Sequence, residues 1–267
     1  MVCDDTNQDS ESSIFNFESS INMLHQTQGI VLKTIKYGET SVISKVYTEK
    51  FGLQSYIING IRSSKSKSKS GLLQVFSLLD MIVYHGVHKN LQRVKEFKSA
   101  FVFSSLPFDM LKISVGLFAI EVMNKCIKEE EKNKVLFDFL FEFIHSLDQI
   151  PSNSLANLPI YFLLHFSKYL GFGPGNNFTE SKNVFDLKEG LFTERQPGHS
   201  YYLQAPFSEF ISQLLSCKLE TSATVRINKD QRKVLTEAFL KYYQLHIDSF
   251  HQVKSYTILA EVLAGSQ

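Results

Sequence analysis

The sequence pattern from residue 24 to residue 98 predicts β-strands joined by short connections. Its first part, GIVLKTIKYGETSVISKVYTEKFGLQSYIING, is rich in Val, Ile, Thr and Tyr, and it alternates between two faces, as with Val42 and Val46 against Ile43. LLQVFSLLDMIVYHG predicts one long, largely buried strand, and NLQRVKEFK predicts the last one. Roughly five strands in about 75 residues leave no room for crossover helices, which predicts a small antiparallel barrel of the five-stranded OB type.

The hydrophobic period changes from two to 3.6 residues after about residue 105. Apolar residues recur at helical spacing from Leu111 to Cys126, and Ser105 or Asp109 is a suitable N-cap. NKVLFDFLFEFIHSLDQI and LANLPIYFLLHFSKYLGF are apolar around most of their circumference, which predicts two buried helices of a bundle. Further helices are expected at about 207–216, 229–246 and 253–264.

These patterns predict an α+β protein with an OB-fold β-barrel over residues 23–100 and an α-helical domain over residues 101–267. A Gly-, Pro- and Asn-rich insert with one hairpin is expected within the helical domain, at residues 171–203. Residues 1–22 are Ser-, Asn- and Asp-rich, and they are predicted to form a disordered acidic extension. A start of the protein at Met23 is the alternative, and the sequence leaves both open.

The formal net charge of +1 conceals a strong asymmetry. Residues 1–22 contain five Asp or Glu and no Lys or Arg, whereas residues 23–98 contain twelve Lys or Arg and four Asp or Glu, a net +8. Within this part, NGIRSSKSKSKSG alternates lysine with serine, and no acidic residue lies between Lys50 and Asp80. Lysine and serine side chains both suit contact with phosphate. The pattern indicates a polyanion-binding surface, with a merely soluble hairpin as the alternative for the loop.

Four aromatic residues of the barrel, Tyr37, Tyr47, Phe51 and Tyr56, have two possible roles. Each could stack on a base of single-stranded nucleic acid. Since strand aromatics usually pack inward, we expect each of them to belong to the barrel core.

Several classes of protein are disfavoured by composition. The chain has no run of 18 or more apolar residues, and its N-terminus lacks the basic and apolar regions of a secretory signal, so no membrane association is expected. The three cysteines are far apart and odd in number, which argues against a disulfide framework and suits a reducing cytosol.

No catalytic or metal-binding motif is evident. His85 and His88 are explained as a solvated turn, and His145 and His165 as core histidines bonded to a neighbour. GFGPG follows a helix and lacks the Lys-Ser/Thr of a phosphate loop, so a helix cap is expected there. KEEEK is expected to be a solvated link between helices, and no nucleophile has an obvious base. The chain is therefore not expected to be an enzyme.

Four motifs follow one another in the barrel: GIVL at residues 29–32, YGETS at 37–41, YTEKFG at 47–52, and GIR at 60–62 before the basic loop. Their order and spacing resemble the N-terminal barrel of the RecO family, which are bacterial recombination mediators. LLQVFSLLDMIVYHG with NLQRVKE resembles the closing strands of that family, and YYQLHIDSFHQVKSYTILAEVL resembles its helical ending. The resemblance spans the chain from about residue 23 to its end.

The resemblance implies an OB-fold barrel, a helical domain and a role in recombinational DNA repair after DNA damage. It implies binding to single- and double-stranded DNA, annealing of complementary strands, and action with RecR and single-strand-binding protein in loading the RecA recombinase. It also implies a cytoplasmic, nucleoid-associated bacterial protein. Many members carry a four-cysteine zinc site near residues 171–203, where this sequence has no cysteine, so no metal or cofactor is expected. Aromatic residues such as Phe178, Phe185 and Phe192 are expected to pack the insert instead.

Nine basic residues are predicted to form the DNA-binding face of the barrel. The C-terminal tail of single-strand-binding protein is expected in a groove of the helical domain lined by apolar and basic residues, which the sequence does not identify. Two alternatives remain, an OB-fold protein–protein adaptor without direct DNA contact and a nucleic-acid enzyme with unrecognised catalytic residues. The nine predicted residues are Lys33, Lys36, Lys45, Arg62, Lys65, Lys67, Lys69, Arg93 and Lys95.

Overall fold

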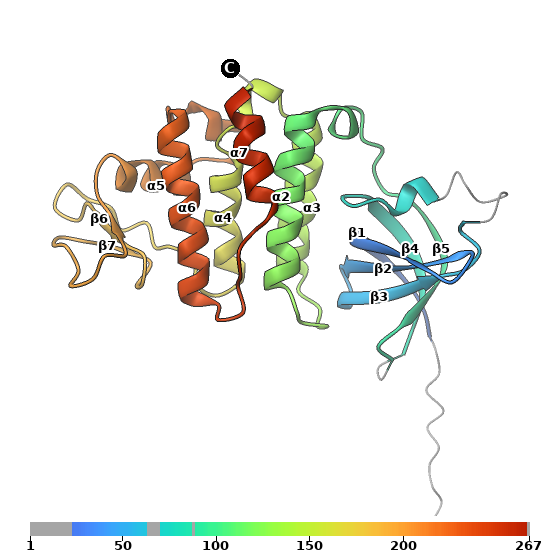
Figure 1. The fold of residues 1–267 in the computed structure, drawn as a ribbon. Helices are drawn as coiled ribbons and strands as arrows, with labels where there is room; N and C mark the ends of the chain where they lie inside the picture. The colour runs from blue at the N-terminus through green and yellow to red at the C-terminus, as the bar shows by residue number, and fades with distance from the viewer. Residues whose placement is uncertain (1–22, 63–69, 87–88, 266–267) are drawn as a thin grey trace, which may run out of the picture.

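A computed structural model of the chain describes residues 23–62, 70–86 and 89–265. It consists of a β-barrel followed by a bundle of helices, and a small sheet lies at the end of the bundle away from the barrel (Figure 1). The strands are β1 (Met23–Tyr37), β2 (Ser41–Thr48), β3 (Gly52–Ile58), β4 (Leu78–His85), β5 (Gln92–Ser99), β6 (Val184–Asp186), β7 (Leu191–Thr193) and β8 (Tyr202–Leu203). The α-helices are α2 (Met110–Cys126), α3 (Lys134–Gln149), α4 (Leu158–Tyr169), α5 (Phe207–Ser216), α6 (Lys229–His246) and α7 (Ser255–Gly265). The disorder predicted for residues 1–22 concerns a segment outside the described residues.

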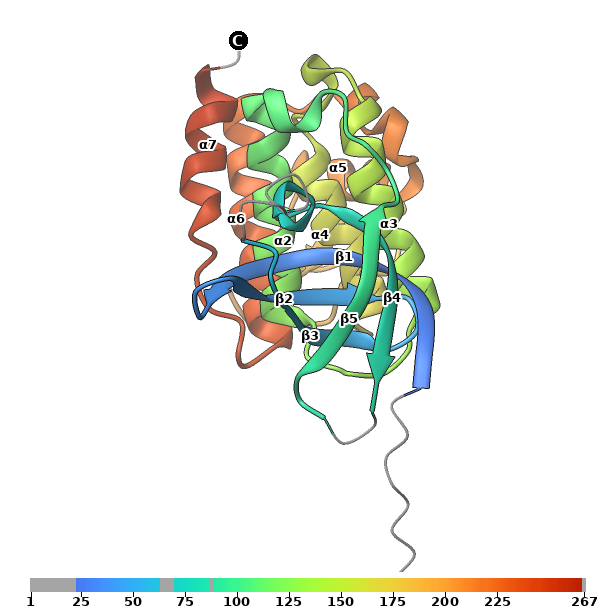
Figure 2. The same cartoon turned by 90° about the vertical axis from the view of Figure 1, so that its right-hand side faces the viewer.

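Strands β1 to β5 close into a barrel in the order β1-β2-β3-β5-β4, with β4 pairing again with β1. All neighbouring strands are antiparallel except β3 and β5, which are parallel. In Figure 2, β1, β2 and β3 run across the direction of β4 and β5. Alternate side chains such as Val46, Tyr56 and Met81 point inward and fill the barrel. The five-stranded OB barrel predicted from the period-two pattern is confirmed.

The long strand predicted over residues 72–86 is wrong in its first half. A 3-10 turn, Gly71–Leu73, comes first, and β4 begins only at Leu78. Between them, Phe76 adopts a φ of +78°, and its N–H donates to the carbonyl oxygen of Val31 at 3.1 Å. Its ring lies against Gly116 of α2, where an added Cβ would approach a ring carbon to 2.7 Å. The chain leaves the extended conformation here because Phe76 packs onto the helical part.

The ends of two helices are set by local hydrogen bonds. The carboxylate of Asp109 accepts from the N–H of Leu111 at 2.8 Å, so the predicted N-cap of α2 is confirmed. Helix α4 ends in a Schellman motif, in which Gly171 has a φ of +89° and the N–H of Phe172 donates to the carbonyl oxygen of Ser167 at 3.2 Å. The GFGPG segment is therefore the helix cap that we expected.

The helices differ in how much of their surface they bury. Helix α4 is buried on nearly all sides, as predicted. Helix α3 buries one face, whereas Asp138 and Glu142 on the other face are exposed, so α3 is less buried than α4. Its pattern is that of an amphipathic helix at the edge of a bundle.

The insert forms a three-stranded sheet in the order β7-β6-β8, which is the predicted hairpin plus one short strand. Phe185 and Phe192 are buried, with ring centroids 5.0 Å apart, and the ring of Phe178 lies edge-on to Phe192 at 5.3 Å. Aromatic packing fills the centre of the insert, as expected from the sequence.

The barrel and the bundle share one hydrophobic core. Tyr47 and Leu53 point out of the barrel and pack in the same cluster as residues of α2 and α3. The backbone N–H of Leu53 also donates to the carbonyl oxygen of Glu129, in the exposed KEEEK link, at 3.1 Å. The link is solvated as predicted, but its backbone is part of the contact between the two parts.

A buried carboxylate fixes the segment that leads from the barrel into α2. Asp148, near the end of α3, accepts from the backbone N–H groups of Ser104 at 3.0 Å, Ser105 at 2.8 Å and Leu106 at 2.6 Å. The ammonium group of Lys112, itself buried, donates to the carbonyl oxygen of Asp148 at 2.7 Å. Burial alone would raise the pKa of Asp148, but these hydrogen bonds lower it well below its usual range.

Candidate nucleic-acid interface

The outer surface of β1, β2 and β3 carries a polar row. Lys33 is the cross-strand neighbour of Lys45, which in turn pairs with Ser55. All three face away from the barrel interior, because the residues adjacent to them on β2 and β3 point inward. Partial burial and the neighbouring charge of Lys33 lower the pKa of Lys45. Two cations held side by side repel each other, and a phosphate group bound between them would relieve that repulsion.

A second outward-facing row runs alongside the first and continues around the barrel. Ile35, Ile43 and Ile57 pair in succession across β1, β2 and β3. Ile57 is then the neighbour of Arg93 on β5, and Arg93 is the neighbour of Tyr84 on β4. Apolar and aromatic side chains next to cations are the composition of a surface that binds single-stranded nucleic acid, since the phosphates meet the cations and the bases meet the apolar groups.

Two of the predicted residues lie at the end of the barrel. The guanidinium of Arg62 donates to the carbonyl oxygen of Gly38 at 3.2 Å, so this side chain lies on the turn between β1 and β2. Lys36 pairs with Val42, which points inward, so Lys36 projects from the opposite side of the sheet to Lys33. Neither belongs to the rows described above.

Lys95 also lies apart from these rows. The register of β4 and β5 is irregular at Ile82 and Val83, and Lys95 is the residue left without a cross-strand partner there. Its side chain is exposed next to Glu96. Of the nine predicted residues, Lys33, Lys45 and Arg93 lie on the connected outer rows, Lys36, Arg62 and Lys95 lie elsewhere on the barrel, and Lys65, Lys67 and Lys69 lie outside the described residues.

The four barrel aromatics have different positions. Tyr56 is buried in the barrel core, as expected. Tyr47 is buried too, but outside the barrel against the helices, so the expectation of barrel-core packing is wrong for it. Burial together with Glu129 raises the pKa of Tyr47 to about 12. Phe51 packs against the barrel core and stacks on His85, with ring centroids 3.9 Å apart. Tyr37 is half exposed at the end of β1, so the expectation of core packing is wrong for this residue.

Tyr84 is a candidate site residue that was not predicted from the sequence. Tyr84 and Leu91 are both exposed, and they line an open cavity of about 600 Å³ at the base of the β4–β5 hairpin. The signal was present, because Met81 and Val83 are inward positions in β4 and strict alternation then places Tyr84 outside.

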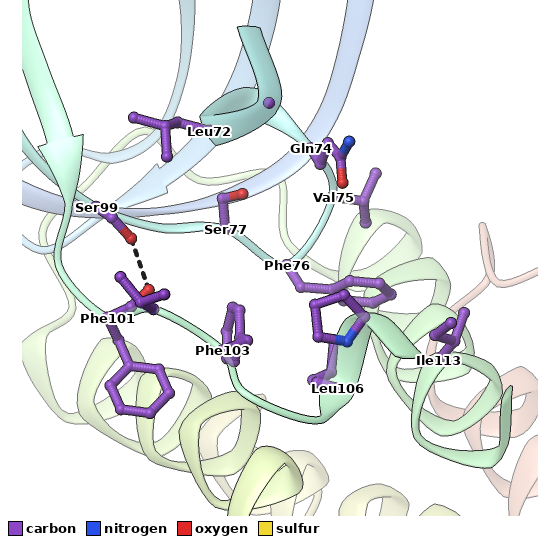
Figure 3. A pocket seen from close by; sticks show the side chains of 13 residues that line it. Leu72, Gln74, Val75, Phe76, Ser77, Ser99, Phe101, Phe103, Leu106 and Ile113 are labelled. Carbon is purple, nitrogen blue, oxygen red and sulfur yellow. Dashed lines mark hydrogen bonds between the residues drawn. The ribbon is translucent and has the colours of Figure 1, made fainter. Parts of the chain in front are cut away.

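A separate cleft of about 400 Å³ lies where the barrel meets the helices (Figure 3). Phe76, Phe101, Phe103 and Leu106 line it, and the hydroxyl of Ser99 at its edge donates to the carbonyl oxygen of Phe101 at 2.6 Å. None of the described residues that line it is charged, so this part of the surface does not suit a phosphate group.

Within the part of the chain that the structure describes, no three His, Cys, Asp or Glu side chains are placed to share a metal ion. The Nε2–H group of His165 donates to the carbonyl oxygen of Leu214 at 3.1 Å, and burial lowers the pKa of His165 to about 4, so it is the core histidine that we predicted. His88, the expected turn partner of His85, lies outside the described residues. Among the described helices, none is long and apolar enough to cross a membrane.

A closed five-stranded barrel with cations on its outer rows, followed by a helical bundle, defines a protein built around an OB-fold module. The family described as "Recombination protein O N terminal" matches residues 23–103, and "Recombination protein O C terminal" matches residues 107–256. The chain belongs to the RecO family.

Curated relatives agree with this assignment. The "DNA repair protein RecO" of Flavobacterium psychrophilum is 35% identical over 243 residues, covering 90% of this chain and 99% of the relative. That of Bacteroides fragilis (strain ATCC 25285) is 34% identical over 241 residues, with the same coverage. The role of the chain is therefore in DNA repair and recombination.

Proposed function

We propose that this chain is a non-enzymatic recombination mediator of the bacterial cytoplasm and nucleoid. It binds single- and double-stranded DNA, anneals complementary strands, and helps to load the RecA recombinase together with RecR and single-strand-binding protein. The observation that supports this most directly is the cross-strand pair of Lys33 and Lys45, beside a row that leads to Arg93 on the outside of an OB barrel.

The mechanism follows from the kind of contact that these side chains make. Lysine and arginine on the outer rows neutralise phosphates and release condensed counterions, which gives affinity without sequence preference. The base edges of a strand held by its phosphates remain free to pair. Two complementary strands can then approach each other because the repulsion between their backbones is reduced.

We propose the groove between the start of α6 and α7 as the site for the acidic, hydrophobic tail of single-strand-binding protein. Arg232, Tyr256 and Leu263 line it, and the positive charges of Lys229 and Lys233 outnumber the one carboxylate in its lining, Asp230. Arg232 and Leu263 also line a second hollow, beside the start of α2. An apolar groove with basic edges suits an acidic peptide with a hydrophobic end.

The DNA-binding proposal is tested by fluorescence anisotropy with a labelled single-stranded oligonucleotide over a series of salt concentrations. Each phosphate contact contributes about 0.7 to the log–log salt slope for single strands, so the slope should fall by about 1.4 in Lys33→Ala/Lys45→Ala and by about 2 in a variant with alanine at all three loop lysines. A control with the same loss of charge, Lys182→Ala/Lys218→Ala, changes exposed lysines of the helical part and should leave the slope unchanged. The three loop lysines are Lys65, Lys67 and Lys69.

The adaptor without DNA contact is the second candidate. It is favoured by three exposed apolar side chains near the junction of barrel and bundle, Val102, Phe108 and Met110, which are 79%, 85% and 65% exposed. Weak binding of oligonucleotides with no dependence on their length or on salt, together with unchanged behaviour of the lysine variants, would favour this function over the first.

A further inference from the structure

A buried amide side chain, that of Gln92, lies at the cavity at the base of the β4–β5 hairpin. The side chain of Gln92 is buried, and its carbonyl oxygen accepts from the N–H of Gly86 at 3.0 Å. Its amide group donates to the carbonyl oxygens of Gly86 at 2.9 Å and Lys89 at 2.8 Å. Three hydrogen bonds from one side chain fix both ends of the hairpin loop, so the residues around the cavity are positioned before any ligand arrives.

The lining of this cavity combines an aromatic face, an apolar side chain and two cations. Tyr84 and Leu91 are each 37% exposed, and Lys89 and Arg93 lie beside them. Tyr84 and Arg93 are cross-strand neighbours, which keeps the phenol ring and the guanidinium group within reach of one ligand. None of the described residues that line the cavity is acidic.

The ring of Tyr84 is available for stacking. Another aromatic ring of the barrel, that of Phe51, is not available in this way, because it stacks on the ring of His85. Within residues 23–62, 70–86 and 89–265, no other aromatic ring is paired with Tyr84 in this way. An exposed tyrosine ring next to two cations favours a ligand with a flat apolar part, which stacks on the ring, and a negative charge, which meets the cations.

We infer that Tyr84 is a stacking platform for one unpaired base of single-stranded DNA, whose flanking phosphates meet Arg93 and Lys89. This inference rests on the proposed function and adds strand preference to it. In a duplex both faces of each base are already stacked, so Tyr84 has nothing to contact there. The pair of Lys33 and Lys45, by contrast, contacts phosphates and accepts either form of DNA.

The test compares Tyr84→Thr with Tyr84→Phe in anisotropy titrations against a labelled single strand and against its duplex. Threonine removes the ring but suits a strand, so the variant should fold, which the melting temperature verifies. We expect Tyr84→Thr to weaken single-strand binding about tenfold, consistent with the loss of one stacked base, and to leave duplex binding within twofold. Tyr84→Phe should bind like the wild type, because the ring and not the hydroxyl is needed.

Phe108→Thr is the matched control, since it removes an aromatic ring that is 85% exposed and lies outside both the barrel and the cavity. It should leave single-strand binding unchanged. A second readout is the fluorescence of 2-aminopurine placed in the single strand, which is quenched by stacking, and we expect quenching with wild type and Tyr84→Phe but not with Tyr84→Thr.

The outcomes separate this inference from the proposed function. If Tyr84→Thr weakens single-strand and duplex binding equally, or weakens neither, or if Phe108→Thr has the same effect, the stacking role is refuted while DNA binding by the barrel stands. If the wild type binds neither form of DNA, both the stacking role and the proposed function fail.

Discussion

Replacing Asp148 with asparagine tests whether this carboxylate holds the barrel to the bundle. Its Oδ1 accepts the N–H groups of Ser105 and Leu106, and its Oδ2 accepts that of Ser104. An asparagine amide has one oxygen, so in either orientation its NH₂ group faces at least one backbone N–H. An unpaired buried donor costs about 1–3 kcal/mol, and the charge-assisted bonds weaken as well, so we expect Asp148→Asn to lose about 3 kcal/mol of unfolding free energy.

Urea unfolding at pH 7 measures this loss, and Asp138→Asn is the matched control. Asp138 is an exposed carboxylate on the same helix, paired with Lys134 at 2.9 Å, and its replacement should cost no more than about 0.5 kcal/mol. Because the folded pKa of Asp148 is lowered, its contribution is present above the ordinary value of 3.8 and is lost as the pH falls through the folded pKa. The gap between wild type and Asp148→Asn should therefore narrow below pH 3.8. A loss at pH 7 no larger than that of the control, or a gap that does not depend on pH, would refute the reasoning.

Three further predictions concern other parts of the molecule. Gly116→Ala should destabilise the wild type by about 1 kcal/mol, because the added Cβ meets the ring of Phe76. In a Phe76→Ala background the ring is gone, so the higher helix propensity of alanine should stabilise the protein by a similar amount. Urea unfolding measures both changes. In an NMR titration the imidazole of His165 should stay neutral until about pH 4. The unfolded chain binds this proton already near pH 6.5, so the free energy of unfolding should fall as the pH is lowered from 6.5 towards 4. His165→Gln removes the titrating group and should lose less stability over that range. Lys33→Ala should raise the pKa of Lys45, which amine NMR can follow, because one of the two causes that lower it is removed.

Local patterns predicted most of the fold. Helix α6 lies where it was expected, because its start is encoded by a capping box in which Asn228 and Gln231 satisfy each other's backbone N–H groups. The strands of the barrel follow from period-two alternation in the same way. The segment around Phe76 could not be predicted, since its departure from a strand depends on the space beside Gly116, 40 positions further along the chain.

The candidate site was harder to predict than the fold. A count of charges indicated the barrel, but the adjacency of Lys33 and Lys45 depends on the strand register, which shifts between Val31 and Lys33. The same alternation that predicted the strands places Lys36 on the other side of the sheet. Composition therefore indicated the right part of the chain, and only the register identified which cations can act together.

Two contacts join the barrel to the helices: the ring of Phe76 packs beside Gly116, and the carboxylate of Asp148 binds the segment that leads into α2. They affect how the two proposed binding surfaces, the outer rows of the barrel and the groove at α6 and α7, would work together. Because these two contacts join the barrel to the bundle, we expect the distance between the outer rows and the groove at α6 and α7 to vary little. Consider a partner protein that is bound to DNA and places its peptide in the groove. Binding of that DNA to the outer rows of the barrel is then an intramolecular step, and its strength depends on the effective concentration of the tethered DNA instead of on its concentration in solution. A nearly fixed distance between the two surfaces makes this gain in affinity selective. Only partners in which the linker between the peptide and the DNA-bound part matches that distance can use both surfaces at once.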